Sequence, residues 1–532
     1  MNKFDIPIEQ VRRTEQCDYD VVILGGAFSG ASLGLLLKRK VPDLRVLIIE
    51  KTEVFNRKVG ESSSEVMGCF LTKILHLNQH MAEEHLPKNG LRMWFHKEQD
   101  DCPSMASEMG PKFLSRFPTF QINRAKLDAH LIQLGQEAGC VLERPATIKS
   151  FERGGVGKNS VTYKDAAGIK KTVSAGWVVD ASGKASLFAK KGGVFKSMAD
   201  EHQTSAMWTR FTGVRQLDSH AGRRLMGQTV GCTVGSRELS TNHLTGYGWW
   251  CWIIPLGNGE VSAGLVWDQR LFTPPSGGKV QERVLEHLLK HPVGRVMFGD
   301  AKPVEGDNCY YKGLAYRSED VAGDGWSTVG DACGFMDPLY SQGLDYCSHT
   351  VFNTFTIISD YYGGEDYHVA LERFREQFPM SYQSWFEALY KDKYYYLGDA
   401  EIMNIAFLLD IATYFVGPVN LVYTNPDGEF SKLPYNGKIG AGFAKVMAFY
   451  NRRLVSMAKK KIEAGIYGDK NLNHDFLLAS GHNIGSQSSE ILIKGLIQWA
   501  KVELRLAFVK PKEGKRVPDG PIGVTPIPVE AG

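Results

Sequence analysis

The stretch "DYDVVILGGAFSGASLGLLLKRKVPDLRVLIIEK", residues 18–51, decides the fold of this chain. It begins as an apolar strand, passes through a glycine-rich turn into a helix rich in leucine and alanine, and ends in a second apolar strand. Gly25, Ala27 and Gly30 occupy the three positions of a G-x-G-x-x-G turn, and Glu50 ends the second strand. This order predicts a βαβ unit that binds a dinucleotide.

Each of these residue types has a physical reason for its place. A turn without bulky Cβ groups lets a pyrophosphate lie against the backbone amides at the start of the helix. Glu50 lies about 20 residues beyond the turn, where a carboxylate meets a ribose hydroxyl. Ala27 replaces the second glycine and crowds the phosphate slightly. The pattern does not recur after another convincing strand, so we predict one dinucleotide and no nicotinamide site.

Composition excludes several classes of protein. The chain has 532 residues, of which 43% are hydrophobic and 23% charged, as in an ordinary globular enzyme of two or three domains. A net charge of +3 is nearly balanced, which argues against a dedicated nucleic-acid binder. The nine cysteines are scattered without C-x-x-C spacing, so we expect neither disulfides nor a metal site. Without an apolar signal at the N-terminus, these features predict a cytoplasmic protein.

The longest apolar stretch is "IMNIAFLLDIATYFVGPVNLVY", residues 402–423. It contains Asn404 and Asp410 and is interrupted by a Gly-Pro pair. Because a carboxylate in the middle of a membrane span is costly, we predict a buried or site-lining helix and no membrane span.

Three further stretches indicate which dinucleotide is bound: "QINRAKLDAHLIQLGQEAGCVL" (121–142), "WVVDASGKASLFAKK" (177–191) and "GWSTVGDACGFMDPLYSQGLDY" (325–346). This set, in this order, resembles the FAD-dependent monooxygenase superfamily built on the hydroxybenzoate hydroxylase plan. The resemblance implies that FAD is the cofactor, that Asp331 holds its ribityl chain and that Arg124 lies near it.

The segment Trp250-Cys251-Trp252-Ile253-Ile254-Pro255 is similar to the W-x-W-x-I-P motif of the flavin-dependent halogenases, a subgroup of that superfamily. "RKVGESSSEVMG" (57–68) resembles that family's segment near the flavin, which implies that Arg57 binds the cofactor. The resemblance also covers "GDACGFMDPLYSQG" (330–343) and spans roughly residues 18–350.

The two tryptophans have two compatible interpretations. Because side chains alternate along a strand, Trp250 and Trp252 share one face and could simply pack in the core. The resemblance implies instead that Trp250, Trp252 and Pro255 form a rigid wall of the substrate tunnel, which keeps an organic substrate away from the flavin C4a position.

The resemblance also implies a reaction. Reduced FAD (FADH2) and dioxygen form a C4a-hydroperoxide, which chloride or bromide attacks to give hypohalous acid. The backbone amides of Gln342 and Gly343 hold the halide at a helix start, although the family usually has a small residue or proline where Gln342 stands. A separate NAD(P)H-dependent flavin reductase supplies FADH2. The substrate is an electron-rich aromatic (phenol, pyrrole or indole-like), free or on a carrier protein.

Lys88 is the candidate catalytic residue. "LPKNGLRMWFHKE" (86–98) resembles the K-x-G-x-x-F-x-W segment of phenol-type halogenases, which implies that Lys88 relays the hypohalous acid to the substrate. A desolvated amine has a lowered pKa and could form a haloamine, whereas an ammonium could orient hypohalous acid by a hydrogen bond. The residues do not decide between these two roles of Lys88. Lys97, in the same segment, serves as the control lysine. The loop glutamate of the tryptophan halogenases is absent, which favours a phenol or pyrrole.

These patterns predict an α/β fold: a Rossmann-type FAD-binding domain with an antiparallel sheet substrate domain and a C-terminal helical region. The predicted segments are 15–200 (first part of the FAD-binding domain), 201–290 (substrate-domain sheet), 291–375 (second part of the FAD-binding domain), 376–510 (helices closing the substrate tunnel) and 511–532 (irregular tail).

Four functions fit these patterns. The first is a halogenase supplied with FADH2. The second is a monooxygenase that inserts oxygen directly and does not need Lys88. The third is a flavin-dependent reductase of double bonds, which would need neither oxygen nor halide. The fourth is an FAD-stabilised binding protein without turnover.

Overall fold

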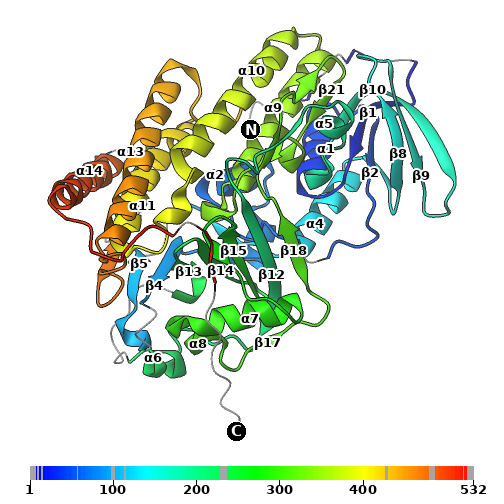
Figure 1. The fold of residues 1–532 in the computed structure, drawn as a ribbon. Helices are drawn as coiled ribbons and strands as arrows, with labels where there is room; N and C mark the ends of the chain where they lie inside the picture. The colour runs from blue at the N-terminus through cyan, green and yellow to red at the C-terminus, as the bar shows by residue number, and fades with distance from the viewer. Residues whose placement is uncertain are drawn as a thin grey trace.

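Two large sheets and a group of C-terminal helices are the main features of the part of the chain that the structure describes (Figure 1). The structure is a computed structural model, and it describes residues 7–8, 11–12, 16–56, 58–97, 102–112, 116–227, 237–425, 429–478, 486–518 and 520–523.

The predicted βαβ unit lies at the centre of the first sheet. β1 (Tyr19–Leu24), α1 (Phe28–Lys40) and β2 (Val46–Ile49) follow the predicted order, and β1 pairs in parallel with β2. The strand order is β20-β21-β10-β1-β2-β7. The added strands are β7 (Val141–Glu143), β8 (Thr147–Glu152), β9 (Asn159–Lys164), β10 (Lys170–Asp180), β20 (Ala322–Gly323) and β21 (Trp326–Thr328).

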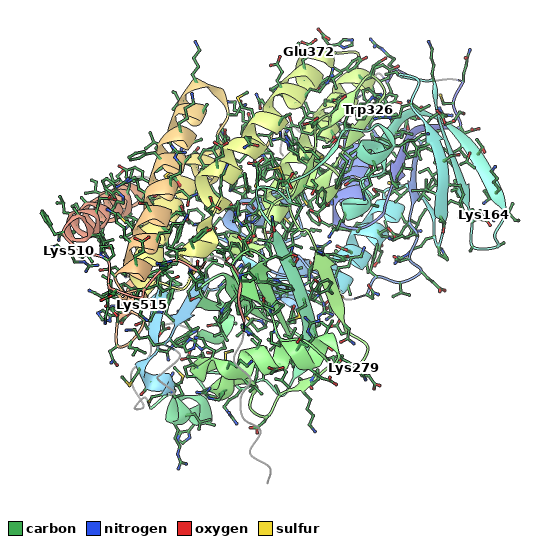
Figure 2. All side chains as sticks on the ribbon, in the orientation of Figure 1. Lys164, Lys279, Trp326, Glu372, Lys510 and Lys515 are labelled. Carbon is green, nitrogen blue, oxygen red and sulfur yellow. The ribbon has the colours of Figure 1, made fainter. Side chains whose placement is uncertain are left out.

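Helices cover one face of this sheet and an antiparallel flap extends the other side. α1 packs against α4 (Arg124–Glu137) and α9 (Gly343–Gly363). Side chains of β8 and β9 pack with others of β1 and β2, so these central strands are buried and, apart from Asp20, mainly apolar. β8 and β9 continue from β10 as an antiparallel hairpin. Lys164, which ends β9, and Lys510 mark opposite sides of the molecule in Figure 2.

The second sheet has the order β17-β12-β15-β14-β13-β4-β5-β23, with β18 paired to β12. Most neighbours are antiparallel, but β13 pairs with β4, and β23 with β5, in parallel. The sheet therefore extends beyond the predicted 201–290 segment and is mixed, because strands distant in sequence complete its edges. Its members are β4 (Leu91–Phe95), β5 (Ser107–Pro111), β12 (Thr204–Thr212), β13 (Thr241–Gly246), β14 (Trp249–Pro255), β15 (Val261–Asp268), β17 (Lys302–Pro303), β18 (Cys309–Lys312) and β23 (Asp475–Leu478).

β14 divides its side chains between two cores. Trp250 and Trp252 lie in the large core shared with the first sheet and the C-terminal helices. Cys251 and Ile253 lie in a second core with α7 (Val280–Lys290) and α8 (Pro292–Phe298). The two tryptophans therefore share one face of the strand, as the alternation predicts.

The C-terminal region is helical, as predicted, with α10 (His368–Trp385), α11 (Ala400–Tyr414), α12 (Asn420–Thr424), α13 (Gly437–Glu463) and α14 (Ser486–Ala507). The segment Ala400–Thr424 is long and apolar enough to cross a membrane. However, 67% of its apolar 18-residue stretch is buried inside the protein, as in a core helix. β24 (Ile522–Gly523) pairs with β16 (Phe272–Thr273), so this part of the predicted irregular tail is a strand.

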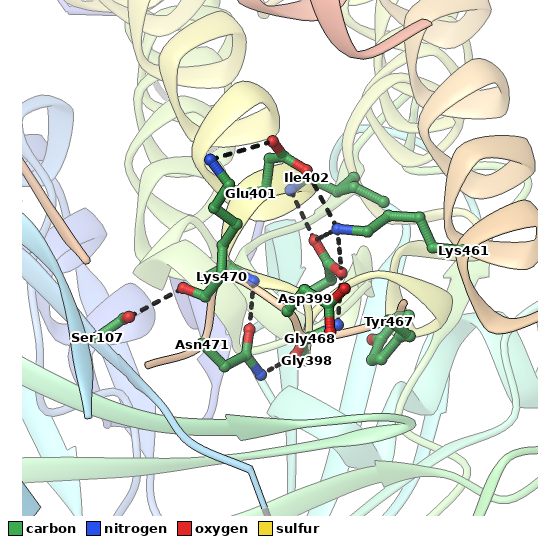
Figure 3. A network of polar contacts seen from close by, with 12 residues as sticks. Ser107, Gly398, Asp399, Glu401, Ile402, Lys461, Tyr467, Gly468, Lys470 and Asn471 are labelled. Atoms are coloured by element: carbon green, nitrogen blue, oxygen red, sulfur yellow. Dashed lines mark hydrogen bonds and ion pairs between the residues drawn. The ribbon is translucent and has the colours of Figure 1, made fainter. Parts of the chain in front are cut away.

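A buried ion network joins these helices (Figure 3). Lys461 Nζ of α13 lies 2.6 Å from Asp399 Oδ2 and 3.2 Å from Glu401 Oε2. Asp399 also caps α11, because its Oδ1 accepts a hydrogen bond from Ile402 N at 3.0 Å. Its Oδ2 accepts another from Gly468 N at 2.8 Å. The carboxylate therefore holds three segments of the C-terminal region together.

We expect Lys461→Met to lower the free energy of unfolding by about 3–5 kcal/mol, because it leaves the fully buried Asp399 without its partner charge. Chemical denaturation checks this. Lys460→Met, at an exposed position of the same helix, is the control and should change the value by no more than about 0.5 kcal/mol. Equal effects of the two variants would contradict the role of the network.

Candidate active site

The predicted glycine turn packs so closely against other backbone that two of its positions have no space for a side chain. A Cβ on Gly25, whose φ is +118°, would lie 2.4 Å from the Ala181 carbonyl oxygen. A Cβ on Gly30 would lie 1.9 Å from the Gly25 carbonyl oxygen. Ala27 is the N-cap of α1 and supplies no side-chain cap, so the first amides of this helix keep their capacity to bind an anion.

Glu50 lies beside this turn at the end of β2. Its Oε2 accepts a hydrogen bond from Gly26 N at 2.7 Å, and its Oε1 accepts two from Thr52, at 2.9 Å from N and 2.7 Å from Oγ1. Burial acts to raise the pKa of Glu50, but these hydrogen bonds outweigh it and lower the pKa. The carboxylate is therefore held ionised, as an acceptor for a ribose hydroxyl must be.

Arg124 and Asp331 come from separate segments to the same side of α1. Arg124 begins α4 and makes two hydrogen bonds of 3.0 Å to Asp128. Asp331 lies in the short turn Gly330–Ala332, where a Cβ on Gly330 would lie 2.3 Å from Ser29 Oγ in the first turn of α1. Burial raises the pKa of Asp331, and the nearby Arg124 charge opposes that rise.

These positions fit a dinucleotide such as FAD, because the glycine cradle, an ionised carboxylate and Asp331 surround one helix start. Arg57, the remaining predicted cofactor residue, lies outside the described residues.

The proline loop runs from β22 (Gly334–Phe335) to the start of α9. Two successive residues, Tyr340 and Ser341, have left-handed φ values of 69° and 63°. The Tyr340 hydroxyl donates to Asp410 Oδ2 at 2.9 Å, and Lys393 Nζ lies 2.5 Å from the same oxygen. A buried ion pair of the C-terminal region therefore holds this unusual turn.

A small cavity of about 20 Å³ lies where the loop meets α9. A space of this size holds about one water molecule or small ion. The predicted halide residues Gln342 and Gly343, the N-cap and the first residue of α9, both line it. Its other lining residues are Gly334, Phe335, Met336, Asp337, Tyr346, Tyr382, Trp385 and Tyr390.

Hydrogen bonds connect the tryptophan strand to this cavity. Trp250 Nε1 donates to the Tyr394 hydroxyl at 2.9 Å, and that hydroxyl donates to Asp337 Oδ2 at 2.8 Å. His202 Nε2 lies 2.8 Å from the same oxygen. The ring of Trp252 lies 6.1 Å from that of Trp250.

Pro255 ends β14 and is half-buried, on the strand that carries both tryptophans. It pairs with Val261 at the far end of the strand from Trp250. The structure gives it no hydrogen bond to the proline loop.

Lys88 is buried between β3 (Leu86–Pro87) and β4, and only 6% of it is exposed. Its Nζ donates to the Ser63 carbonyl oxygen at 2.7 Å. Burial lowers the pKa of Lys88 to about 8, while the charges of Glu65 and Asp345 oppose the drop. Lys97, by contrast, is exposed and pairs with an aspartate at 2.8 Å.

Lys88 lies close to both the cavity loop and the tryptophans. Asp345, in the first turn of α9, is near enough to influence its pKa. On the other side, burial lowers the pKa of His243 to about 3, and the Lys88 charge adds to that drop. The His243 ring lies 5.3 Å from the Trp250 ring. The structure thus brings Lys88, Trp250 and the start of α9 into one region.

Sequence reasoning missed several residues of this region. Asp345 accepts hydrogen bonds from Ser64 and, at 3.0 Å, from the Tyr414 hydroxyl, and burial raises its pKa to about 7. It directly follows the loop that the sequence singled out, which was the available signal. Tyr394 and Lys393 lie in an aromatic helical stretch without a motif, so their role required the structure.

The family model described as FAD binding domain matches residues 18–238. The chain is 25% identical over 430 residues to flavin-dependent halogenase chlA of Dictyostelium discoideum, covering 75% of this chain and 69% of that protein. It is 26% identical over 365 residues to a 1H-pyrrole-2-carbonyl peptidyl-carrier-protein brominase of Pseudoalteromonas luteoviolacea, covering 67% and 81%. It spans 60 to 63% of the length of three other halogenase relatives.

The fold matches that of halogenase PltM, solved in complex with phloroglucinol and FAD, with a TM-score of 0.67 and 16% identity. The match covers 92% of this chain and 98% of that chain. The predicted fold class is therefore confirmed, with the FAD-binding domain, the second sheet and the helical region all present.

We expect Gly30→Ala to abolish FAD binding, because the new Cβ would meet the Gly25 carbonyl oxygen and force the turn open. The flavin content of the purified protein, measured by absorbance, checks this. Gly442→Ala, where an added Cβ meets no atom within 4 Å, is the control and should retain FAD. Full flavin content in Gly30→Ala would place the cofactor elsewhere.

The glycine turn and the positions of Glu50 and Asp331 fit the FAD-binding domain that the family model matches. Residues 18–238 match an FAD-binding domain, and the chain is similar in sequence and in fold to flavin-dependent halogenases.

Proposed function

We propose that the protein halogenates an electron-rich aromatic substrate, using FADH2, dioxygen and chloride or bromide. The observation that carries the proposal is the arrangement of a buried lysine, Lys88, beside the same helix start that lines the cavity at Gln342 and Gly343. Bound FADH2 supplies, with dioxygen, the oxidising chemistry that converts halide to an electrophilic halogen. The residues of the chain bind, orient and exclude water.

Seven residues are proposed to hold the cofactor. The glycine turn receives the pyrophosphate at the start of α1, Glu50 accepts from a ribose hydroxyl, and Asp331 faces the ribityl chain. The complete set is Gly25, Ala27, Gly30, Glu50, Arg57, Arg124 and Asp331.

The halide is proposed to bind in the cavity at the start of α9. The backbone amides of Gln342 and Gly343 are the donors, supported by the positive end of the helix dipole. The aromatic walls exclude water, which favours a large and weakly hydrated anion.

Lys88 is proposed to pass the electrophilic halogen to the substrate. Its Nζ is anchored by the Ser63 carbonyl oxygen, so the head group has a defined position. With a pKa of about 8, both the ammonium and the amine are populated near neutral pH. The ammonium form donates a hydrogen bond to hypohalous acid, and the amine form acts as a nucleophile. Trp250, Trp252 and Pro255 are proposed to wall the tunnel beside it.

The names of the relatives support a small aromatic substrate. PltM has been solved with phloroglucinol, a phenol, and a brominase relative acts on a carrier-bound pyrrole. We infer that a phenol or pyrrole, free or on a carrier protein, is the substrate. A separate flavin reductase is proposed as the source of FADH2, because the sequence offers one dinucleotide motif, and the cytoplasm is the proposed location.

The first test is a mass-spectrometric product screen with FAD, a flavin reductase, NADH, oxygen and bromide or chloride against phenols and pyrroles. We expect halogenated products whose formation falls at least about 100-fold in Lys88→Met, because the relay is lost. FAD binding should be unchanged. Lys97→Met, at an exposed lysine, is the control and should retain activity. Products that gain one oxygen, independent of halide and of Lys88, would identify a hydroxylase.

A second test concerns pH. The rate of halogenation should show an ionisation near pH 8, the pKa of Lys88. The Asp345 carboxylate raises that pKa, so Asp345→Asn should move the midpoint to lower pH. Asp469→Asn, which removes the partner of the control residue Lys97, should leave it in place. A midpoint that Asp345→Asn does not move would show that another group controls the profile.

A further inference from the structure

We propose that the side-chain amide of Gln342 donates a third hydrogen bond to the halide and sets the halide preference of the enzyme. The inference rests on the proposed function, and deepens it, because it assigns a specificity role to a side chain that differs from the small residue or proline usual in the family.

Two aromatic residues fix the orientation of this amide. Trp385 Nε1 donates to Gln342 Oε1, and the Tyr390 hydroxyl donates to the same oxygen at 2.7 Å. An indole N–H is only a donor, so the atom it contacts must be the amide oxygen rather than the nitrogen. The Gln342 oxygen is therefore turned towards the aromatic pair, and the amide nitrogen is turned away from it.

The amide nitrogen has no acceptor among the residues that the structure describes, although Gln342 is only 7% exposed. The nitrogen is not among the fully buried side-chain atoms that lack a partner, so water or a ligand can reach it. Gln342 lines the cavity, and the cavity is the place where an acceptor can stand. The accessible donor is therefore available to an anionic or polar ligand there.

The surroundings favour a halide over a larger anion. The cavity measures about 20 Å³, which is too small for a phosphate or a carboxylate with its substituent. The carboxylate of Asp337 also borders it, and both of its oxygens already accept hydrogen bonds. Its Oδ2 accepts hydrogen bonds from the Tyr394 hydroxyl and from His202 Nε2, both at 2.8 Å, and its Oδ1 accepts one from Leu339 N at 3.0 Å.

The orientation of the donor is set by the C-terminal region. Trp385 ends α10, and Tyr390 ends the π-helical turn that follows it, Phe386–Tyr390. The loop contributes the backbone amides and these helices aim the side chain, so the halide site is complete only when the two regions pack together.

The experiment uses the FAD-loaded full chain and measures bromide and chloride binding through the change in flavin absorbance. Gln342→Ser should raise the bromide Kd at least about tenfold, because it removes a hydrogen bond to a charged group. The halide KM should rise with it, while kcat at saturating halide changes little. The ratio of the bromide and chloride values should also change. Gln133→Ser, at an exposed position on α4, is the control.

Gln342→Glu keeps the size of the side chain and the oxygen that accepts hydrogen bonds from Trp385 and Tyr390. This variant is therefore expected to fold even if Gln342→Ser does not. It replaces the donor by a negative oxygen and should abolish halide binding while FAD remains bound. In bromide-soaked crystals, the anomalous peak should lie within hydrogen-bond distance of Gln342 Nε2. A peak elsewhere would overturn the inference.

The experiments distinguish a wrong proposed function from a wrong role for the Gln342 side chain. If the wild-type protein forms no halogenated product and binds no halide, the proposed function is wrong and the inference falls with it. If the wild type halogenates but Gln342→Ser keeps both halide constants within about twofold, only the role of the side chain is wrong.

Discussion

The buried carboxylate of Asp337 is the contact on which the arrangement of the site depends. It lies on the proline loop and receives hydrogen bonds from Tyr394 of the C-terminal region, from His202 and from the loop backbone. Through Tyr394 it also reaches Trp250 in the second sheet. A buried carboxylate is tolerated only when its oxygens are matched, so this one group requires three regions of the chain to meet at one place.

The same loop stores backbone strain that its neighbours offset. Left-handed conformations at Tyr340 and Ser341 cost about 1–3 kcal/mol each. The bond from Tyr340 to Asp410, and the buried charge of Lys393 beside it, hold the turn in place. The result is a helix start whose amides are preorganised before any ligand arrives, which is the condition for strong electrostatic binding.

Much of the binding site for the cofactor follows from local sequence. Gly25 and Gly30 are required because their missing Cβ atoms lie against backbone, and the distance along the chain to Glu50 is set by the length of one helix and one strand. The extent of the second sheet was harder to predict from the sequence. β4, β5 and β23 join it from distant segments, and pairing between distant strands has no signal in a single local pattern.

The sequence by itself determined the βαβ unit, because this rests on residue types at fixed short spacings. FAD as the cofactor and the candidates Lys88, Gln342 and Gly343 were implied by the resemblance of its motifs to those of the halogenases. Only the tertiary structure decided that Lys88 is buried beside Asp345 and that Trp385 and Tyr390 orient Gln342. Burial and hydrogen-bond partners depend on which distant segments pack together, and that packing is a property of the folded chain.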